Sequence, residues 1–369
     1  MGWWEGPLEE LGLKSTYPHP SKDFWKGRRV WLSGHTGFKG AWLAFWLQEL
    51  GAKVCGCSLP PPTHPSLFQK LGLGCLLEHQ IMDIRDEDGV RQSMENFQPE
   101  VVFHLAAQAL VRPGYENPVG TFGVNVQGTV HILDAMRHVR SVRAAVLVTT
   151  DKVYRDLEDG RPFREEDALG GRDPYSASKS AAEMAISCYR KSYFLAQGVG
   201  IAAARAGNVI GGGDWSKDRI LPDAIRAWSK GGVLTVRNPH ATRPWQHVLE
   251  PLAGYLRLGQ FLFQNPSTAG EFNFGPAVGQ NATVRAVVEA ACEKFGSGKV
   301  VWGESQPGPY EASCLSLDPD RAAKELGVFP VWGLSQAVEQ TMLWYRKDLE
   351  GCEAKQLCRD NLKNFLAGG

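Results

Sequence analysis

The fold is decided by residues 28–50, which read RRVWLSGHTGFKGAWLAFWLQEL. Residues 28–33 contain the apolar run Val30-Trp31-Leu32 and predict a strand, and residues 41–50 predict a helix. Between them Gly34, Gly37 and Gly40 form a G-x-x-G-x-x-G turn, a spacing that differs from the usual G-x-G-x-x-G fingerprint. Glycines let the backbone approach a pyrophosphate, and the start of a helix favours its negative charge, although such turns also serve packing. The stretch predicts a dinucleotide-binding strand, turn and helix.

Downstream, strands alternate with helices at the rhythm of a parallel sheet. We therefore predict an α/β fold with a doubly wound, Rossmann-like parallel sheet, whose ligands lie outside the carboxyl ends of the strands. The further strands are predicted at residues 53–58, 79–82, 101–105, 144–149 and 200–205, and the helices at 86–97, 121–139 and 175–197.

Beyond residue 206 the pattern loosens into a glycine-rich loop at 207–215, followed by a smaller, interleaved α/β substrate domain. Its elements are predicted at 222–230, 234–237, 249–263, 271–274, 284–295, 318–325 and 334–349. The predicted organisation is an N-terminal arm (1–25), a dinucleotide-binding domain (26–206, with 247–275 packing back onto it), a substrate domain (207–246 and 276–350) and a frayed helix or tail (351–369).

The composition is that of an ordinary globular protein of 369 residues, with 43% hydrophobic and 22% charged residues. Forty basic residues balance forty acidic ones, so no overall field attracts nucleic acid or an anionic membrane. The N-terminus lacks the basic start and apolar run of a secretory signal, and no apolar run is long enough for a membrane span. We expect a cytoplasmic protein with neither nucleic acid nor membrane as a partner.

The eight cysteines are scattered, which favours reduced thiols over a disulfide framework. Cys55 and Cys57 form a C-x-C pair within a predicted strand, but no second pair with zinc-like spacing accompanies them. We expect structural cysteines and no metal site.

Proton-moving side chains follow one strand and begin the next helix. Thr150, Asp151 and Lys152 come directly after residues 144–149, and Tyr175 and Lys179 form a Tyr-x-x-x-Lys pair. That spacing places both side chains on one helix face, where the ammonium would lower the pKa of the phenol. The alternatives are a chance Tyr and Lys pair and a solvated turn at Asp151 and Lys152.

These motifs resemble those of the extended short-chain dehydrogenases/reductases, and within them the CDP-glucose 4,6-dehydratases. Thr150-Asp151-Lys152 matches that branch, since dTDP-glucose dehydratases carry Thr-Asp-Glu and simple epimerases and reductases lack the pair. The matching segments are GHTGFKG (34–40), HLAAQ (104–108), LVR (110–112), TDKVY (150–154), DPYSASK (173–179), RAGNVIGGGDW (205–215) and RPWQHV (243–248).

The resemblance implies a three-step reaction on a nucleotide-linked glucose, within deoxysugar and surface-polysaccharide biosynthesis. Tyr175, helped by Lys179 and Thr150, removes the proton of the carbon 4 hydroxyl while hydride passes to NAD. Asp151 protonates the leaving hydroxyl of carbon 6, and hydride returns to carbon 6. Lys152 either assists removal of the carbon 5 proton or stabilises the enolate.

The resemblance also implies binding residues for NAD and for CDP-glucose. The segment after residues 53–58 carries neither an acid for the adenosine ribose nor an arginine for an extra phosphate, so NAD against NADP stays open. Residues 306–310 differ from the family's pattern, so cytidine recognition also stays open. The cofactor residues are Gly34, Thr36, Gly37, Phe38, Lys39, Gly40, Asp83, Ile84, Leu105, Ala106, Ala107, Gln108, Asn125, Tyr175 and Lys179. The substrate residues are Gln108, Arg112, Asn208, Arg219, Arg243, Gln246 and Glu311.

A homodimer, or a tetramer, is expected through the apolar faces of the helices at 121–139 and 175–197, although those faces could be core. Three rival functions remain: a GDP-mannose or dTDP-glucose dehydratase, a nucleotide-sugar epimerase or reductase, and a redox-sensing NAD(P)-binding regulator. Asp151 and Lys152 speak against an epimerase or reductase, and the Tyr175 and Lys179 pair speaks against a regulator.

Overall fold

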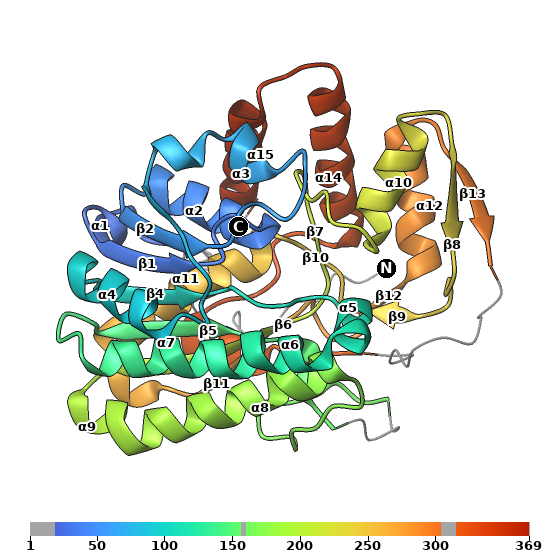
Figure 1. The fold of residues 1–369 in the computed structure, drawn as a ribbon. Coiled ribbons are helices and arrows are strands. Elements are labelled where there is room, and N and C mark those ends of the chain that lie inside the picture. Colours follow the sequence, from blue (N-terminus) through green and yellow to red (C-terminus); the bar gives the residue numbers. More distant parts are fainter. Residues whose placement is uncertain (1–18, 156–159, 304–314, 369) are drawn as a thin grey trace, which may run out of the picture.

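The computed structural model describes residues 19–155, 160–303 and 315–368, and its centre is a sheet of seven parallel strands (Figure 1). The strand order is β11-β6-β5-β4-β1-β2-β3. From β1 the chain adds β2 and β3 on one side, and it then crosses to the other side of β1, where it adds β4, β5, β6 and β11. This confirms the predicted doubly wound fold. The strands are β1 (Arg29–Ser33), β2 (Lys53–Ser58), β3 (Glu78–Ile81), β4 (Val101–His104), β5 (Ala144–Val148), β6 (Gly200–Ala206) and β11 (Glu271–Phe274).

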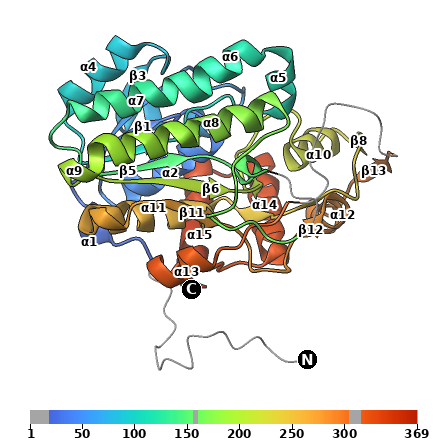
Figure 2. The same cartoon turned by 90° about the horizontal axis from the view of Figure 1, so that it is seen from below.

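Both faces of the sheet are covered, because successive strand residues point to opposite sides. In β1, Val30 and Leu32 enter one apolar core and Trp31 enters the other. One face carries α2 (Phe38–Glu49) and α11 (Leu249–Gln264), and the other carries α4 (Glu87–Phe97), α7 (Gly128–Arg137) and α8 (Pro174–Tyr189) (Figure 2). The strands β1, β4 and β5 at the middle of the sheet are largely apolar, and polar side chains of the cleft follow their carboxyl ends.

A smaller part of the chain stands beside the carboxyl ends of the strands (Figure 1). Its β8 (Val233–Val236) pairs in parallel with β13 (Lys299–Trp302), and α10 (Ile220–Trp228) and α12 (Val284–Phe295) pack beside them. Two short ribbons, β7 (Val209–Ile210) with β10 (Gln246–His247) and β9 (Thr242–Arg243) with β12 (Ala282–Thr283), join this part to the sheet. The arrangement leaves a cleft between the two parts.

The remaining elements are short helical turns and three C-terminal helices. The segment expected at 121–139 is a helix at 118–137 with a π-helical turn in its middle, η3 (Gly123–Gln127). The short elements are α1 (Lys22–Trp25), α3 (Leu67–Lys70), η2 (Leu73–Cys75), α5 (Val111–Glu116), α6 (Pro118–Phe122), η4 (Asp151–Val153), η5 (Arg190–Phe194), α9 (Leu195–Gln197) and η6 (Pro266–Thr268). The C-terminal helices are α13 (Asp320–Leu326), α14 (Leu334–Leu349) and α15 (Ala354–Ala367).

The C-terminal segment differs from the frayed helix or tail that the sequence suggested. Helix α15 buries Leu357, Cys358, Leu362 and Phe365 against the rest of the protein. The Phe365 ring meets Trp46 and Trp332 edge to face, at centroid distances of 6.0 and 5.2 Å. The apolar stripe of α15 therefore completes the core beneath α2.

No helix in the described ranges has the length and apolar character needed to cross a membrane. Within the same ranges, no group of three or more His, Cys, Asp or Glu side chains is arranged to hold a metal ion.

Candidate active site

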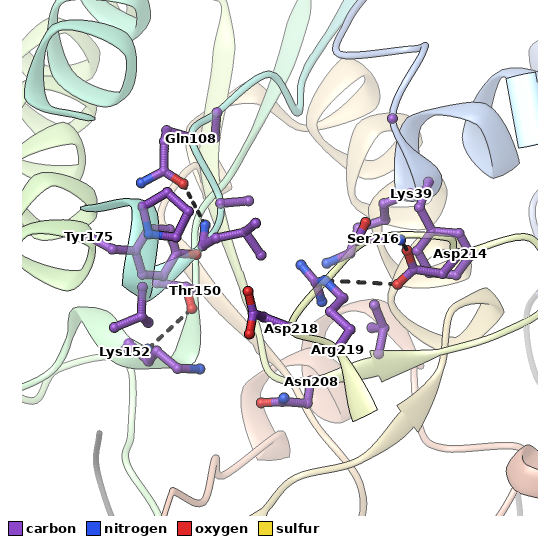
Figure 3. Close-up of a pocket in the computed structure, with 18 of the residues that line it drawn as sticks. Lys39, Gln108, Thr150, Lys152, Tyr175, Asn208, Asp214, Ser216, Asp218 and Arg219 are labelled. Atoms are coloured by element: carbon purple, nitrogen blue, oxygen red, sulfur yellow. Dashed lines mark hydrogen bonds and ion pairs between the residues drawn. The ribbon is translucent and has the colours of Figure 1, made fainter. Parts of the chain in front are cut away.

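A cleft of about 740 Å³ lies where β1, β4, β5 and β6 end and the smaller part of the chain begins. Its volume is in the range of small-molecule sites. Figure 3 shows Gln108, Thr150, Lys152 and Tyr175 on one side and Lys39 and Arg219 on the other. The cleft therefore joins the two parts of the chain in one site.

The glycine turn forms one end of the cleft. Gly34 has φ +79°, and a Cβ there would lie 2.7 Å from the Ala106 nitrogen, so only glycine fits. A Cβ on Gly40 would collide with the Gly34 carbonyl, so this third glycine lets α2 pack against the turn. Helix α2 starts at Phe38, three residues earlier than predicted, and no side chain caps Gly37. Its first amides are therefore free to bind an anion.

Ser33 joins the ends of β1 and β4, a link that the sequence reading missed. Its hydroxyl lies 2.7 Å from His104 Nδ1 and accepts the Leu105 and Ala106 amides at 3.1 Å each. Ala106 and Ala107 line the cleft beside this link. A small polar residue at the strand end before the glycine turn was the only signal for it.

The end of β2 presents hydroxyls where many such domains carry an acid. Thr36 Oγ1 donates to the Leu59 carbonyl at 2.8 Å and lies 2.8 Å from Ser58 Oγ. Asp83 also lines the cleft, but it is paired with Arg85 at 2.6 Å. This edge of the cleft therefore carries no net charge, because the negative charge of Asp83 is balanced by Arg85.

The turn after β5 holds the predicted acid in the cleft wall. Asp151 is 1% exposed, and its Oδ1 accepts hydrogen bonds from Thr150 Oγ1 and Lys152 Nζ, each at 2.9 Å. Its Oδ2 is buried and has no hydrogen-bond partner in the described part of the chain. Burial and an ion pair exclude the solvated turn that was the alternative for these residues.

Helix α8 brings Tyr175 and Lys179 to the same wall. Its first turn is fixed by a capping box in which the Asp173 carboxylate accepts the Tyr175 and Ser176 amides at 2.9 and 3.0 Å. Lys179 Nζ donates to the Val148 carbonyl at 3.2 Å, which ties the helix to β5. Tyr175 and Lys179 are 7% and 5% exposed, so both belong to the cleft wall and not to a solvated helix face.

Burial dominates the ionisation of this pair. It raises the pKa of Tyr175 to about 12, against a hydrogen bond from Thr150 and the charge of Arg219, which lower it. The prediction of a lowered phenol pKa is therefore wrong, because desolvation outweighs the hydrogen bond from Thr150 and the charge of Arg219. Burial also lowers the pKa of Lys179 to about 8, which the Glu183 carboxylate partly offsets.

Lys39 is the most perturbed cation of the cleft. Burial and, to a smaller extent, the charge of Arg219 lower its pKa to about 7, while Asp151 opposes the shift. The sequence reading placed Lys39 among the cofactor residues, but it could not show how several cations from distant segments converge on it.

The opposite wall carries the expected arginines. Arg219 Nε lies 3.8 Å from Asp214 Oδ2, and Arg112 Nη1 lies 3.9 Å from Asp218 Oδ1. Arg243 is buried and donates to the Thr242 carbonyl at 2.9 Å. These three arginines come from different segments and face one cleft.

Nearly all the predicted site residues line this cleft. Asn125 does not: it lies behind the wall, where its side chain holds the Gln108 backbone at 2.9 and 3.0 Å and Ser178 Oγ at 2.9 Å. Gln246 is buried next to the cleft, and Glu311 falls outside the described residues. The predicted residues that line it are Gly34, Thr36, Gly37, Phe38, Lys39, Gly40, Asp83, Ile84, Leu105, Ala106, Ala107, Gln108, Arg112, Thr150, Asp151, Lys152, Tyr175, Lys179, Asn208, Arg219 and Arg243.

Known protein sequences resemble this chain over most of its length. A sequence profile described as GDP-mannose 4,6 dehydratase matches residues 32–341. The CDP-glucose 4,6-dehydratase of Salmonella typhimurium is 44% identical over 352 residues, which cover 94% of this chain and 98% of the relative.

Solved structures share the fold. UDP-glucose 4-epimerase from Thermus thermophilus, in complex with NAD, superposes with a TM-score of 0.72 at 26% identity, covering 86% of this chain and 99% of the epimerase. The dTDP-glucose 4,6-dehydratase of Bacillus anthracis, also in complex with NAD, superposes with a TM-score of 0.73 at 19% identity, covering 88% and 98%.

Proposed function

The chain belongs to the GDP-mannose 4,6-dehydratase family, and from this premise we propose that it is a CDP-glucose 4,6-dehydratase. It converts CDP-D-glucose to CDP-4-keto-6-deoxy-D-glucose and water. The observation that carries the proposal is the 44% identity with a CDP-glucose 4,6-dehydratase over nearly the whole of both chains. The convergence of Thr150, Asp151, Lys152, Tyr175 and Lys179 in one cleft supports it.

NAD is the cofactor, and when bound it accepts the hydride of carbon 4 and returns it to carbon 6. The uncapped start of α2 suits its pyrophosphate, and Gly34, which carries no side chain, lets the glycine turn lie directly against the Ala106 backbone. Thr36 and Ser58 offer hydroxyls to the adenosine ribose. No arginine among the described residues lining this edge would favour the extra phosphate of NADP.

Tyr175 serves the first step as the base that takes the proton of the carbon 4 hydroxyl. Its raised pKa must fall before it can act, so the groups that favour the phenolate matter most. A hydrogen bond with the Thr150 hydroxyl and the charge of Arg219 both favour the phenolate. Lys179, held one helical turn away, supplies such a charge while it is protonated.

Asp151 and Lys152 serve the elimination as a coupled acid and base. A proton that passes along their 2.9 Å hydrogen bond leaves Asp151 protonated and Lys152 neutral. Lys152 then takes the proton of carbon 5, and Asp151 gives its proton to the departing carbon 6 hydroxyl, which leaves as water. The elimination leaves Lys152 protonated and Asp151 ionised. Lys152 then returns its proton to carbon 5 as hydride reaches carbon 6, and the proton that Tyr175 took from the carbon 4 hydroxyl restores the charge of Lys152.

The diphosphate of the substrate is bound by the arginines of the opposite wall. Arg219 and Arg243 present guanidinium groups that match phosphate oxygens, and Asn208 lines the same cleft. Arg112 belongs to the same wall as these arginines, and Gln108 lies on the side of the catalytic turn. This division places the sugar against Thr150 and Tyr175.

The test is to incubate the purified protein with CDP-, dTDP-, GDP- and UDP-glucose and with GDP-mannose. We expect CDP-glucose alone to give the alkali-induced absorbance of a 4-keto sugar at a substantial rate, and mass spectrometry to show the loss of one water. Conversion of a sugar without loss of water would indicate an epimerase instead. No product from any of these nucleotide sugars would refute the proposal.

We also propose that the protein is a homodimer through α6, α8 and the adjoining turns. Large apolar side chains stand exposed there, with Val119 84% and Met184 60% exposed. Phe122 and Leu195 add to the same face. Light scattering should give a molar mass of twice that of one chain, and the Met184→Lys variant should have the mass of a single chain.

A further inference from the structure

A buried ionic network lies directly behind the catalytic turn. Glu183 on α8 accepts hydrogen bonds from Thr149 Oγ1 at 2.6 Å and from Arg205 Nε at 2.8 Å. Arg205, on β6, also donates through Nη1 to the Tyr154 hydroxyl at 2.8 Å. The four side chains are between 2% and 7% exposed. These four polar side chains are therefore shielded from solvent and depend on one another for hydrogen bonds.

The network holds the catalytic turn at both ends. Thr149 directly precedes Thr150, and Tyr154 directly follows η4, which contains Asp151 and Lys152. Glu183 lies two helical turns beyond Tyr175 on the same helix. One carboxylate and one guanidinium, together with the hydrogen bond from Ser180 Oγ to the Val153 carbonyl at 2.8 Å, therefore link the helix of the carbon 4 base to the turn of the elimination pair.

The polar groups of the network also have their hydrogen-bond partners inside the protein. The Tyr154 hydroxyl donates to Asn273 Oδ1 at 2.6 Å, and Arg205 Nη1 also donates to the Glu165 carbonyl at 3.0 Å. A buried ion pair is a poor source of stability, because desolvation of both charges opposes it. A fully satisfied network instead specifies one geometry.

We propose that Glu183 and Arg205 are positioning residues that hold Asp151 and Lys152 in register with Tyr175, an assignment that rests on the proposed function. Glu183 has a second effect, because its carboxylate raises the pKa of Lys179. It therefore keeps the Lys179 ammonium charged at neutral pH beside the phenol that must ionise.

A pair of variants at Thr149 isolates the link without removing a charge. Thr149→Val deletes the hydroxyl that Glu183 binds, and Thr149→Ser keeps it. We expect Thr149→Val to lower kcat for dehydration about 10- to 100-fold, with KM within about 2-fold of the wild type. Thr149→Ser should restore most of kcat. Equal kcat values for Thr149→Val, Thr149→Ser and the wild type would refute the positioning role.

Glu183→Gln adds a pH test, with Glu271→Gln as its control. Glu271 pairs with Arg190 at 2.7 Å, also between a helical segment and the sheet, but away from the turn. The high-pH limb of kcat should move to lower pH in Glu183→Gln, because Lys179 loses its charge sooner, and should stay in place in Glu271→Gln. Equal shifts in both, or none in Glu183→Gln, would contradict the inference. Should Glu183→Gln fail to fold, the Thr149 pair decides.

The two proposals fail in different ways. A wild-type protein that forms no 4-keto sugar from CDP-glucose refutes the proposed function before any variant is compared. An active wild type together with a fully active, folded Thr149→Val variant refutes only the positioning role.

Discussion

Replacement of Asp151 by asparagine should separate the oxidation of the sugar from its dehydration. The carboxylate is 1% exposed and accepts hydrogen bonds from Thr150 and Lys152 at 2.9 Å, which an asparagine carbonyl can still accept. The variant therefore keeps the shape of the turn but loses the group that carries a proton. Loss of a general acid lowers a rate about 10²- to 10⁴-fold, or about 3–5 kcal/mol of activation free energy.

No other described carboxylate of the cleft is placed to substitute for it. Each is held by a partner away from the catalytic turn: Asp83 by Arg85, Asp173 by the first amides of α8, Asp214 by the Ser216 amide, Asp218 by Arg237 and Asp223 by Arg226. The full loss in dehydration rate should therefore be observed.

The assay follows each step separately. Mixing Asp151→Asn with CDP-glucose should still produce the absorbance of the reduced nicotinamide, while release of the 4-keto-6-deoxy sugar falls. In deuterated water, exchange at carbon 5 should fall as well, because Lys152 can no longer pass its proton to a carboxylate. Dehydration at the wild-type rate would refute the acid assignment, and unchanged exchange at carbon 5 would refute the coupling of Lys152 to Asp151.

Three further changes test other parts of the structure. Tyr175→Phe should abolish formation of the reduced nicotinamide on mixing with CDP-glucose, a loss of about 10²-fold or more, while CDP-glucose still binds by calorimetry. Lys39→Met should stabilise the protein by about 2–3 kcal/mol more at about pH 6 than at about pH 9 in urea unfolding. The sign follows from the pKa of Lys39, which burial lowers to about 7 in the folded protein. Between this pKa and the higher pKa of the unfolded chain, the unfolded chain binds more protons than the folded protein. The free energy of unfolding of the wild type therefore rises with pH across this range, and the destabilisation that Met removes is largest at low pH. Phe365→Ala should lower the free energy of unfolding by about 3–5 kcal/mol, whereas a dispensable tail would show no change.

The sheet could be predicted from the sequence because its strands are short apolar runs that end at polar motifs. Residues 53–58 and 271–274 were placed at their observed bounds. The start of α2 was predicted three residues late, because Gly40 looked like part of the turn although it lies inside the helix. Residues 351–369 were predicted as a frayed helix or tail, but Leu357, Cys358, Leu362 and Phe365 recur at a spacing that buries one face of helix α15.

The site residues could be found from motifs, but their electrostatics could not. The sequence places Tyr175 and Lys179 on one face, yet the pKa of Tyr175 depends on how deeply later segments bury it. The pairing of Glu183 with Arg205 joins a helix to a strand that no local pattern relates. Such contacts depend on tertiary packing, so they could be described only from the structure.

The electrostatics of the cleft also explain how a chain without net charge can bind two anionic ligands. Lys39, Lys152, Lys179 and Arg219 come from the glycine turn, η4, α8 and the loop before α10, and they act on one another across the cleft. Burial and the repulsion of the other three cations disfavour the charged form of Lys39. A diphosphate placed among them would reverse that balance, so binding should draw a proton onto Lys39. The repulsion between these cations is neutralised when the negatively charged diphosphates bind, and this neutralisation contributes to the affinity for both ligands.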